Sequence, residues 1–167
     1  FARRSAWKVI EQGRDFVTME LAQDEATLAA YPWSFACRLT YQLRGGRLHA
    51  RHEVVNLSDT AMPFSLGIHP YLRVPGPREN CVIRCQRATR FNPVGRSDEY
   101  FSEPFPASDL PLTRDYSSTL QLGDLARNEC QLVNTASGLE VILNWEDAPA
   151  FRRLALWSRT PRDRYFC

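Results

Sequence analysis

Hydrophobic and polar residues alternate with a period of two along much of this chain. Side chains of an extended strand point alternately to opposite faces, so this period predicts strands that are buried on one face. The runs that show it are short, rich in β-branched and aromatic residues and bounded by turn residues. They span residues 15–21, 33–43, 47–57, 129–135, 139–145 and 152–158. We therefore predict an all-β fold of antiparallel strands in packed sheets.

The segments between these runs differ in what they predict. Gly45 and Gly46 form a two-residue connection that tolerates positive φ, which predicts a hairpin, and residues 135–138 predict a second one. The window 21–30 has few apolar residues at helical spacing and favours a loop with one turn. Residues 91–112 carry four prolines without sustained alternation. We expect them to run over the sheet surface as a binding loop, a lid or a disordered insert.

Composition limits the class of protein. The chain has 167 residues, 44% hydrophobic and 24% charged, which suits one domain over residues 1–167. No run approaches the roughly 20 apolar residues of a membrane span, and residues 1–10 lack the pattern of a signal peptide. The net charge of +2 is small, and arginines are scattered among acids. We therefore expect neither a membrane nor nucleic acid as a partner.

The cysteines favour a reducing compartment. There are five, an odd number, in a chain too large to need disulfide bonds for stability. Cys81 and Cys85 have three residues between them and no histidine nearby, so we expect them on one face of a short strand and not at a zinc site. We predict reduced thiols, a cytoplasmic location and no metal ion.

Few residues suggest chemistry. His49 and His52 stand three apart in a predicted strand, so their side chains should point to opposite faces and serve structural or solvated roles. The chain has no glycine-rich phosphate loop, nucleophile elbow or His-Glu-x-x-His motif. His69 remains, after the run Phe64 to Ile68, and Pro70 restricts it to an extended conformation. We predict that His69 lies at the end of a strand, with its ring in a cleft and not in the apolar core. From these residues alone it is either a hydrogen-bonded core histidine or a catalytic group.

The chain resembles the aldose 1-epimerase (galactose mutarotase) superfamily over its whole length. The similar stretches include "FARRSAW", "YPWSFACRLTYQL", "EVVNLS" and "LALWSRTPRDRYFC". The most specific is "MPFSLGIHPYLRV", which is similar to the family's Pro-Phe-x-x-Gly-x-His-Pro-Tyr-Phe block. Leu72 stands where the family has its final phenylalanine. The resemblance implies a galactose mutarotase-like supersandwich that binds a sugar in a cleft and needs no cofactor.

The resemblance also implies a reaction and a set of site residues. His69 corresponds to the acid that protonates the sugar ring oxygen, while a glutamate removes the C1 hydroxyl proton. An imidazole, with an ordinary pKa of about 6.5, can both give and take a proton near neutrality. Asp115 corresponds to an aspartate that binds sugar hydroxyls, or it is only a turn residue. Tyr71, and Arg3 at the cleft entrance, are further candidates for binding the hexose; Arg3 is otherwise a solvated surface residue.

The two ends of the chain carry one more expectation. Phe1 follows the point where the family has a His-Gly pair, and Cys167 precedes the family's Val-Glu-Pro. We expect an incomplete portion of a larger protein that retains the acid and lacks the base. Glu146 is the least implausible substitute for that base within the sequence.

Three functions follow from the resemblance. The leading one is a free-hexose mutarotase. The alternatives are a hexose-6-phosphate 1-epimerase and a non-catalytic carbohydrate-binding domain on the same fold. The His-Pro-Tyr spelling favours the free-sugar branch, because the phosphosugar relatives more often have Ser or Thr after the histidine.

Overall fold

The chain folds into two compact units in the computed structural model. Unit 1 comprises Phe1–Ser65 and unit 2 comprises Leu66–Cys167. The structure describes residues 2–93, 100–148, 150–158 and 165–167, and for Tyr165 it describes the backbone alone. The single domain expected over residues 1–167 stays a prediction.

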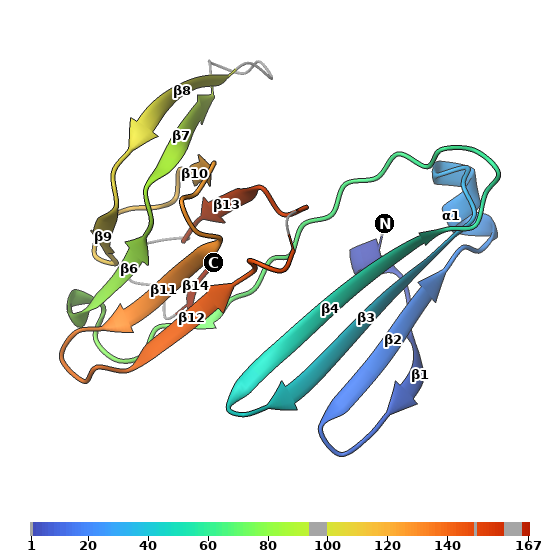
Figure 1. The fold of residues 1–167 in the computed structure, drawn as a ribbon, viewed down its shortest axis with the longest axis horizontal. Helices are drawn as coiled ribbons and strands as arrows, with labels where there is room; N and C mark the ends of the chain where they lie inside the picture. Colours follow the sequence, from blue (N-terminus) through green and yellow to red (C-terminus); the bar gives the residue numbers. More distant parts are fainter. Residues whose placement is uncertain (1, 94–99, 149, 159–164) are drawn as a thin grey trace. The chain divides into compact units, whose positions relative to one another are not determined.

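Unit 1 is one antiparallel sheet with the strand order β1-β2-β3-β4 (Figure 1). The strands β2 and β3 pair from Phe16↔Gln42 to Ala22↔Ala36, and β3 and β4 form a hairpin. Gly45 and Gly46 close that hairpin with φ of 57° and 72°, as the sequence predicted. The elements are η1 (Ala2–Arg4), β1 (Lys8–Gln12), β2 (Phe16–Ala22), α1 (Glu25–Ala30), β3 (Phe35–Arg44) and β4 (Arg47–Asn56).

The helix α1 corrects the expected loop over 21–30. Asp24 accepts a hydrogen bond from the backbone of Thr27, and the Thr27 hydroxyl accepts one from the backbone of Asp24. This reciprocal cap satisfies donors that an open helix end would leave exposed, so the short helix forms without an apolar stripe. Among the described residues, no helix is long and apolar enough to cross a membrane.

In its described residues, unit 2 contains two four-stranded antiparallel sheets and one small two-stranded sheet. The strand orders are β13-β10-β7-β8, β12-β11-β6-β9 and β14-β5. The elements are β5 (Leu72–Arg73), η2 (Arg78–Asn80), β6 (Cys81–Cys85), β7 (Ala88–Pro93), β8 (Tyr100–Phe105), β9 (Ser108–Pro111), β10 (Leu120–Gly123), β11 (Glu129–Asn134), β12 (Glu140–Asn144), β13 (Arg153–Leu156) and β14 (Tyr165–Phe166).

The core of unit 2 lies between its two larger sheets. Alternate residues of β6 are buried, so Cys81 and Cys85 share one face as predicted. Ile83 of β6 and Leu132 of β11 join one buried cluster with Leu122 of β10 in the other large sheet. Two sheets that share one apolar interior form a β-sandwich. The predicted antiparallel all-β fold is confirmed, and the six predicted strands correspond to β2, β3, β4, β11, β12 and β13.

Within 91–112, the described residues 91–93 and 100–112 lie largely in strands and not in the predicted excursion over the sheet surface, while residues 94–99 lie outside the described part of the chain. The strand β7 continues to Pro93 and pairs with β8 from Pro93↔Tyr100 to Ala88↔Phe105, and β9 then pairs with β6. Proline is tolerated on edge strands, where a missing N–H costs no ladder hydrogen bond, and β8 and β9 are both edges. The sequence prediction missed β8 and β9 because their prolines resemble loop residues, although an edge strand with a partner on one side only can contain them.

Gly123 on β10 makes room for a contact between its neighbouring strands. The Arg153 guanidinium carbon lies 3.4 Å from the centroid of the Phe91 ring. A Cβ at Gly123 would stand 2.9 Å from Phe91 Cε2, 3.1 Å from Arg153 Cδ and 3.2 Å from the Arg152 carbonyl oxygen. The cation–π contact therefore depends on the missing side chain.

Replacing Gly123 with alanine should destabilise unit 2. We expect the free energy of unfolding to fall by about 1–3 kcal/mol, because the new methyl group separates Arg153 from Phe91 and crowds a backbone carbonyl. Urea denaturation measures the change. Gly67→Ala is the matched control, since a Cβ there meets nothing within 4 Å. Equal midpoints for the two variants would contradict this account of Gly123.

All five cysteines are free thiols. Cys81, Cys85 and Cys130 are buried at 1%, 2% and 7% exposure, while Cys37 and Cys167 are half-buried. The Cys130 thiol, directly opposite on β11, and burial together raise the pKa of Cys85. Burial also raises the pKa of Cys37 and Cys167. Raised pKa values and burial both lower the reactivity of a thiol.

Thiol titration should separate these cysteines into two classes. With a colorimetric disulfide reagent at neutral pH, we expect slow reaction of the two half-buried thiols and none of the three buried ones in the native chain. All five should react after denaturation. Rapid reaction of more than two thiols in the native state would contradict the described core.

Candidate active site

His69 lies in an irregular segment of unit 2, with its side chain exposed. Residues 61–71 belong to no strand, so the prediction that His69 ends a strand is wrong. Pro63 and Pro70 lack the N–H that a ladder needs, and Phe64 and Ile68 are exposed at 60% and 52%. The exposed imidazole lies outside the apolar core, as expected, and its place in a cleft stays a prediction.

Two side chains of the described residues contact the His69 imidazole. The Tyr71 ring stacks on it with centroids 5.1 Å apart and planes inclined by 20°. Cys167 Sγ lies 2.8 Å from Nδ1 and 3.8 Å from Nε2. The three residues form what we call the His69 cluster, and Cys167 comes from a position 98 residues farther along the chain.

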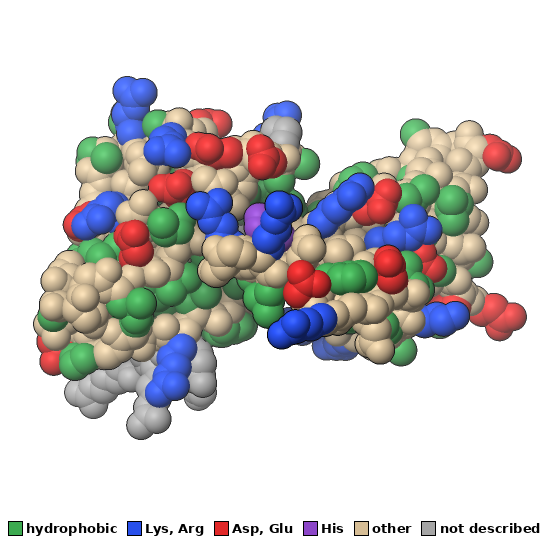
Figure 2. All heavy atoms as spheres, turned by 60° about the horizontal axis from the view of Figure 1, so that its bottom comes forward, with side chains coloured by type: hydrophobic (Ala, Val, Ile, Leu, Met, Phe, Trp, Pro, Cys, Tyr) green, Lys and Arg blue, Asp and Glu red, His purple; other side chains and the backbone are tan. Residues whose placement is uncertain are grey.

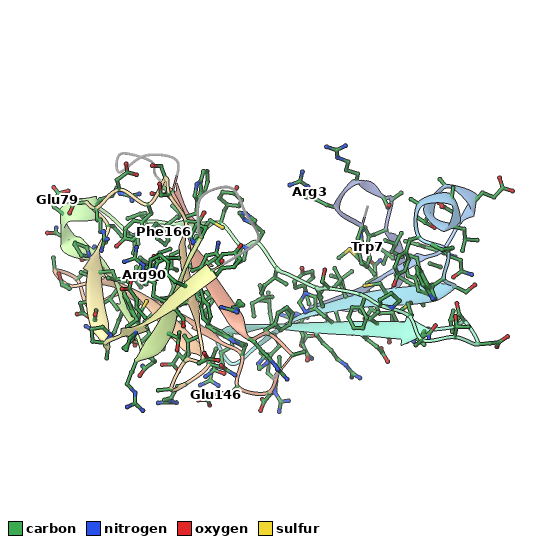
Figure 3. All side chains as sticks on the ribbon, turned by 90° about the horizontal axis from the view of Figure 1, so that it is seen from above. Arg3, Trp7, Glu79, Arg90, Glu146 and Phe166 are labelled. Carbon is green, nitrogen blue, oxygen red and sulfur yellow. The ribbon has the colours of Figure 1, made fainter. Side chains whose placement is uncertain are left out.

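The strand pair β5–β14 brings these distant segments together. Leu72 pairs with Phe166, and Arg73 pairs with Tyr165. Leu72 follows His69 by three positions, and Phe166 directly precedes Cys167. Phe166 is 2% exposed and lies among the interior side chains of unit 2 (Figure 3). Its ring meets the Tyr116 ring edge-on at 5.4 Å. The core thus fixes the backbone that carries the cluster.

Asp115 lies next to Tyr116 in an exposed turn. Its carboxylate accepts a 2.7 Å hydrogen bond from the Ser117 N–H, which lowers the pKa of Asp115. This is the turn role weighed against sugar binding. The neighbouring Tyr116 carbonyl accepts a hydrogen bond from Ser158, so the turn is attached to the chain that precedes β14. Sugar binding by Asp115 stays a prediction.

Arg3 belongs to unit 1, in the short helix η1. Its side chain is exposed, and the Trp7 indole N–H donates to the Ala2 carbonyl beside it (Figure 3). A part in the sugar site stays a prediction for Arg3, as it does for Tyr71.

Three further residues considered from the sequence are His49, His52 and Glu146. His49 and His52 lie three apart on β4 and so point to opposite faces of the sheet, as predicted. Glu146 binds Arg127 with a 3.1 Å ion pair, which occupies the residue considered as a substitute base. Within the described ranges, no three or more His, Cys, Asp and Glu side chains gather in a group that could hold a metal ion.

The surface carries charged side chains of both signs and a hollow at β7 and β8. In the face that Figure 2 shows, acidic and basic side chains are interspersed on each unit. A surface hollow of about 450 Å³ lies at β7 and β8, beside Thr89, Glu103 and Asp124. It contains none of the predicted site residues, and Glu103 there is already paired with Arg90 at 3.5 Å.

The contact of Cys167 with His69 is the part of the site that sequence reasoning missed. The similarity of residues 154–167 to the family placed Cys167 near the active site, but no local pattern paired it with a histidine 98 positions away. The stretch "YFC" at positions 165–167 is too short to show a strand periodicity, so the sequence carries no signal for this contact.

Solved structures with similar folds cover nearly the whole chain. A galactose mutarotase-like protein from Lactobacillus casei is 21% identical, with a TM-score of 0.83 over 99% of this chain and 60% of that one. A galactose mutarotase related enzyme from Lactobacillus acidophilus is 24% identical, with a TM-score of 0.85 over 100% and 59%. A galactose mutarotase-like protein from Clostridium acetobutylicum is 17% identical, with a TM-score of 0.79 over 98% and 55%.

These likenesses confirm the predicted mutarotase-like fold, and the chain spans 55–60% of the length of these three proteins. No curated protein matches the chain significantly. The sequence profile of the family described as Aldose 1-epimerase matches residues 1–147, which include the His-Pro-Tyr block. This match over most of its length shows that the chain belongs to the aldose 1-epimerase family.

Proposed function

We propose that the protein containing this chain interconverts the α and β anomers of a free hexose. The observation that carries the proposal is the His69 imidazole, exposed and held against Tyr71 and Cys167, in a chain of the aldose 1-epimerase family. A ring nitrogen in that setting can meet a sugar arriving from solvent. A histidine buried in the apolar core would have no such access to a sugar.

The reaction needs two proton transfers. His69 donates a proton to the ring oxygen while a carboxylate takes the proton of the C1 hydroxyl, so the C1–O bond to the ring oxygen breaks and an open aldehyde forms. Rotation about the C1–C2 bond and closure on the other face give the other anomer, and both protons return. His69 acts first as acid and then as base, which an imidazole can do near neutral pH.

Replacing His69 with asparagine should nearly abolish anomerisation. We expect kcat of the full-length protein to fall at least about a hundredfold, the lower end of what general acid catalysis contributes, with the fold unchanged. Polarimetry on fresh α-glucose and α-galactose, corrected for the buffer rate, measures it. His49→Asn is the matched control, because it makes the same replacement at an exposed histidine of β4.

Retention of the parental rate by His69→Asn would overturn the proposal. Glucose 6-phosphate belongs in the same assay. Catalysis on the phosphorylated sugar alone would assign the protein to hexose-6-phosphate epimerases, and sugar binding without catalysis would make it a carbohydrate-binding protein.

A pair of substitutions at Asp115 separates sugar binding from turn stabilisation. Asparagine keeps an oxygen that accepts from Ser117 but removes the charge, whereas alanine removes both. If the carboxylate binds sugar hydroxyls, Asp115→Ala should mainly raise KM, by about tenfold for one charge-assisted hydrogen bond, and Asp115→Asn should raise it less. An unchanged KM in both variants would leave Asp115 as a turn residue.

A further inference from the structure

The Tyr71 ring lies against one face of the His69 imidazole. The two centroids are 5.1 Å apart and the planes are inclined by 20°, a near-parallel stack of the kind that aromatic pairs favour. We infer that Tyr71 is a positioning residue, whose ring holds the plane of the imidazole and acts on catalysis through His69, not by binding the sugar. The catalytic part of this inference rests on the proposed function.

The local sequence favours this stack. Only Pro70 separates the two residues, and a proline fixes its own φ at about −65° and keeps the residue before it out of the helical region. Side chains two positions apart in an extended chain can point to the same side, and the stack shows that these two do. Leu72 follows Tyr71 directly and pairs with Phe166, so the backbone next to the tyrosine is held by the strand pair β5–β14.

The stack leaves the proton chemistry of His69 unobstructed. Each ring nitrogen holds its proton or its lone pair in the plane of the imidazole, so protons pass through the edge of the ring and not through a face. Tyr71 covers a face. The stack therefore restricts the directions in which the nitrogens can meet a substrate, and it blocks neither of them.

The stack is also compatible with both charge states of the reaction. His69 is an imidazolium when it acts as the acid and a neutral imidazole when it acts as the base. The electron-rich face of a tyrosine attracts a cation and also packs against a neutral ring. A hydrogen bond depends on where the proton is, whereas this contact needs neither a donor nor an acceptor. The imidazole can therefore keep one plane through the whole cycle.

Direct contact with the sugar is the competing role for Tyr71. The residue is 59% exposed, so its hydroxyl or the face turned away from His69 could meet a hexose. Such a contact holds the substrate and the transition state alike, and its loss would raise KM. Positioning of His69 matters only when the proton moves, so its loss would lower kcat.

The test compares the full-length protein with Tyr71→Phe, which keeps the stacked ring, and Tyr71→Leu, which removes it. An aromatic ring current shifts protons that lie over its face. The carbon-bound protons of the imidazole should therefore resonate upfield in the parent and in Tyr71→Phe, and move downfield in Tyr71→Leu. The variant His69→Asn identifies these NMR signals by their loss. This readout needs no activity, so it stands even if the proposed reaction fails.

Kinetics provide the second readout. Loss of one aromatic contact should lower kcat about threefold to tenfold with KM unchanged, and Tyr71→Phe should retain the parental kcat. Tyr100→Leu is the matched control, because it removes an exposed tyrosine of β8. A rise in KM in place of a fall in kcat would overturn the inference. Identical imidazole shifts in the parent and Tyr71→Leu would overturn it too.

Discussion

The anchoring of Phe166 in the core of unit 2 is the interaction on which the His69 cluster depends. The strand pair β5–β14 is only two residues long on each side, and each of its hydrogen bonds contributes about 0.5–1.5 kcal/mol net. Ordering the backbone costs about 1–2 kcal/mol per residue, so this pairing cannot hold itself. Full burial of one phenylalanine adds about 1.5–3 kcal/mol and its contact with Tyr116 adds more. Apolar packing therefore positions a polar site.

Much of the fold could be predicted because its strands alternate and its hairpins close locally. The ten-residue strands β3 and β4 could be predicted because they and their Gly45-Gly46 turn follow one another directly in the sequence. The elements that could not be predicted depend on a helix cap or on pairing at a sheet edge, and neither produces a hydrophobic period. The helix α1 comes from a cap between Asp24 and Thr27, not from an apolar stripe. The strands β8 and β9 contain prolines and have partners on one side only.

The candidate site also has features that could be predicted from the sequence and features that could not. The His-Pro-Tyr block could be recognised because its three residues are adjacent, and its exposure agrees with a residue that serves chemistry. The strand end assigned to His69 was wrong because Pro63 and Pro70 prevent ladder pairing around it. The Cys167 contact could not be read from the sequence, since it requires the pairing of Leu72 with Phe166 across almost the whole of unit 2.

The distance along the chain between His69 and Cys167 determines when the His69 cluster can form during translation. The hairpin of β3 and β4 can close as soon as it leaves the ribosome, because its partners are neighbours. The His69 cluster waits for a residue made 98 positions later, roughly 5 to 20 s at ordinary elongation rates. From the synthesis of Tyr116 until that of Phe166, the place of Phe166 beside the Tyr116 ring is unfilled, and the nascent chain exposes an apolar surface to water. Chaperones that bind such surfaces would therefore meet this protein before its site exists.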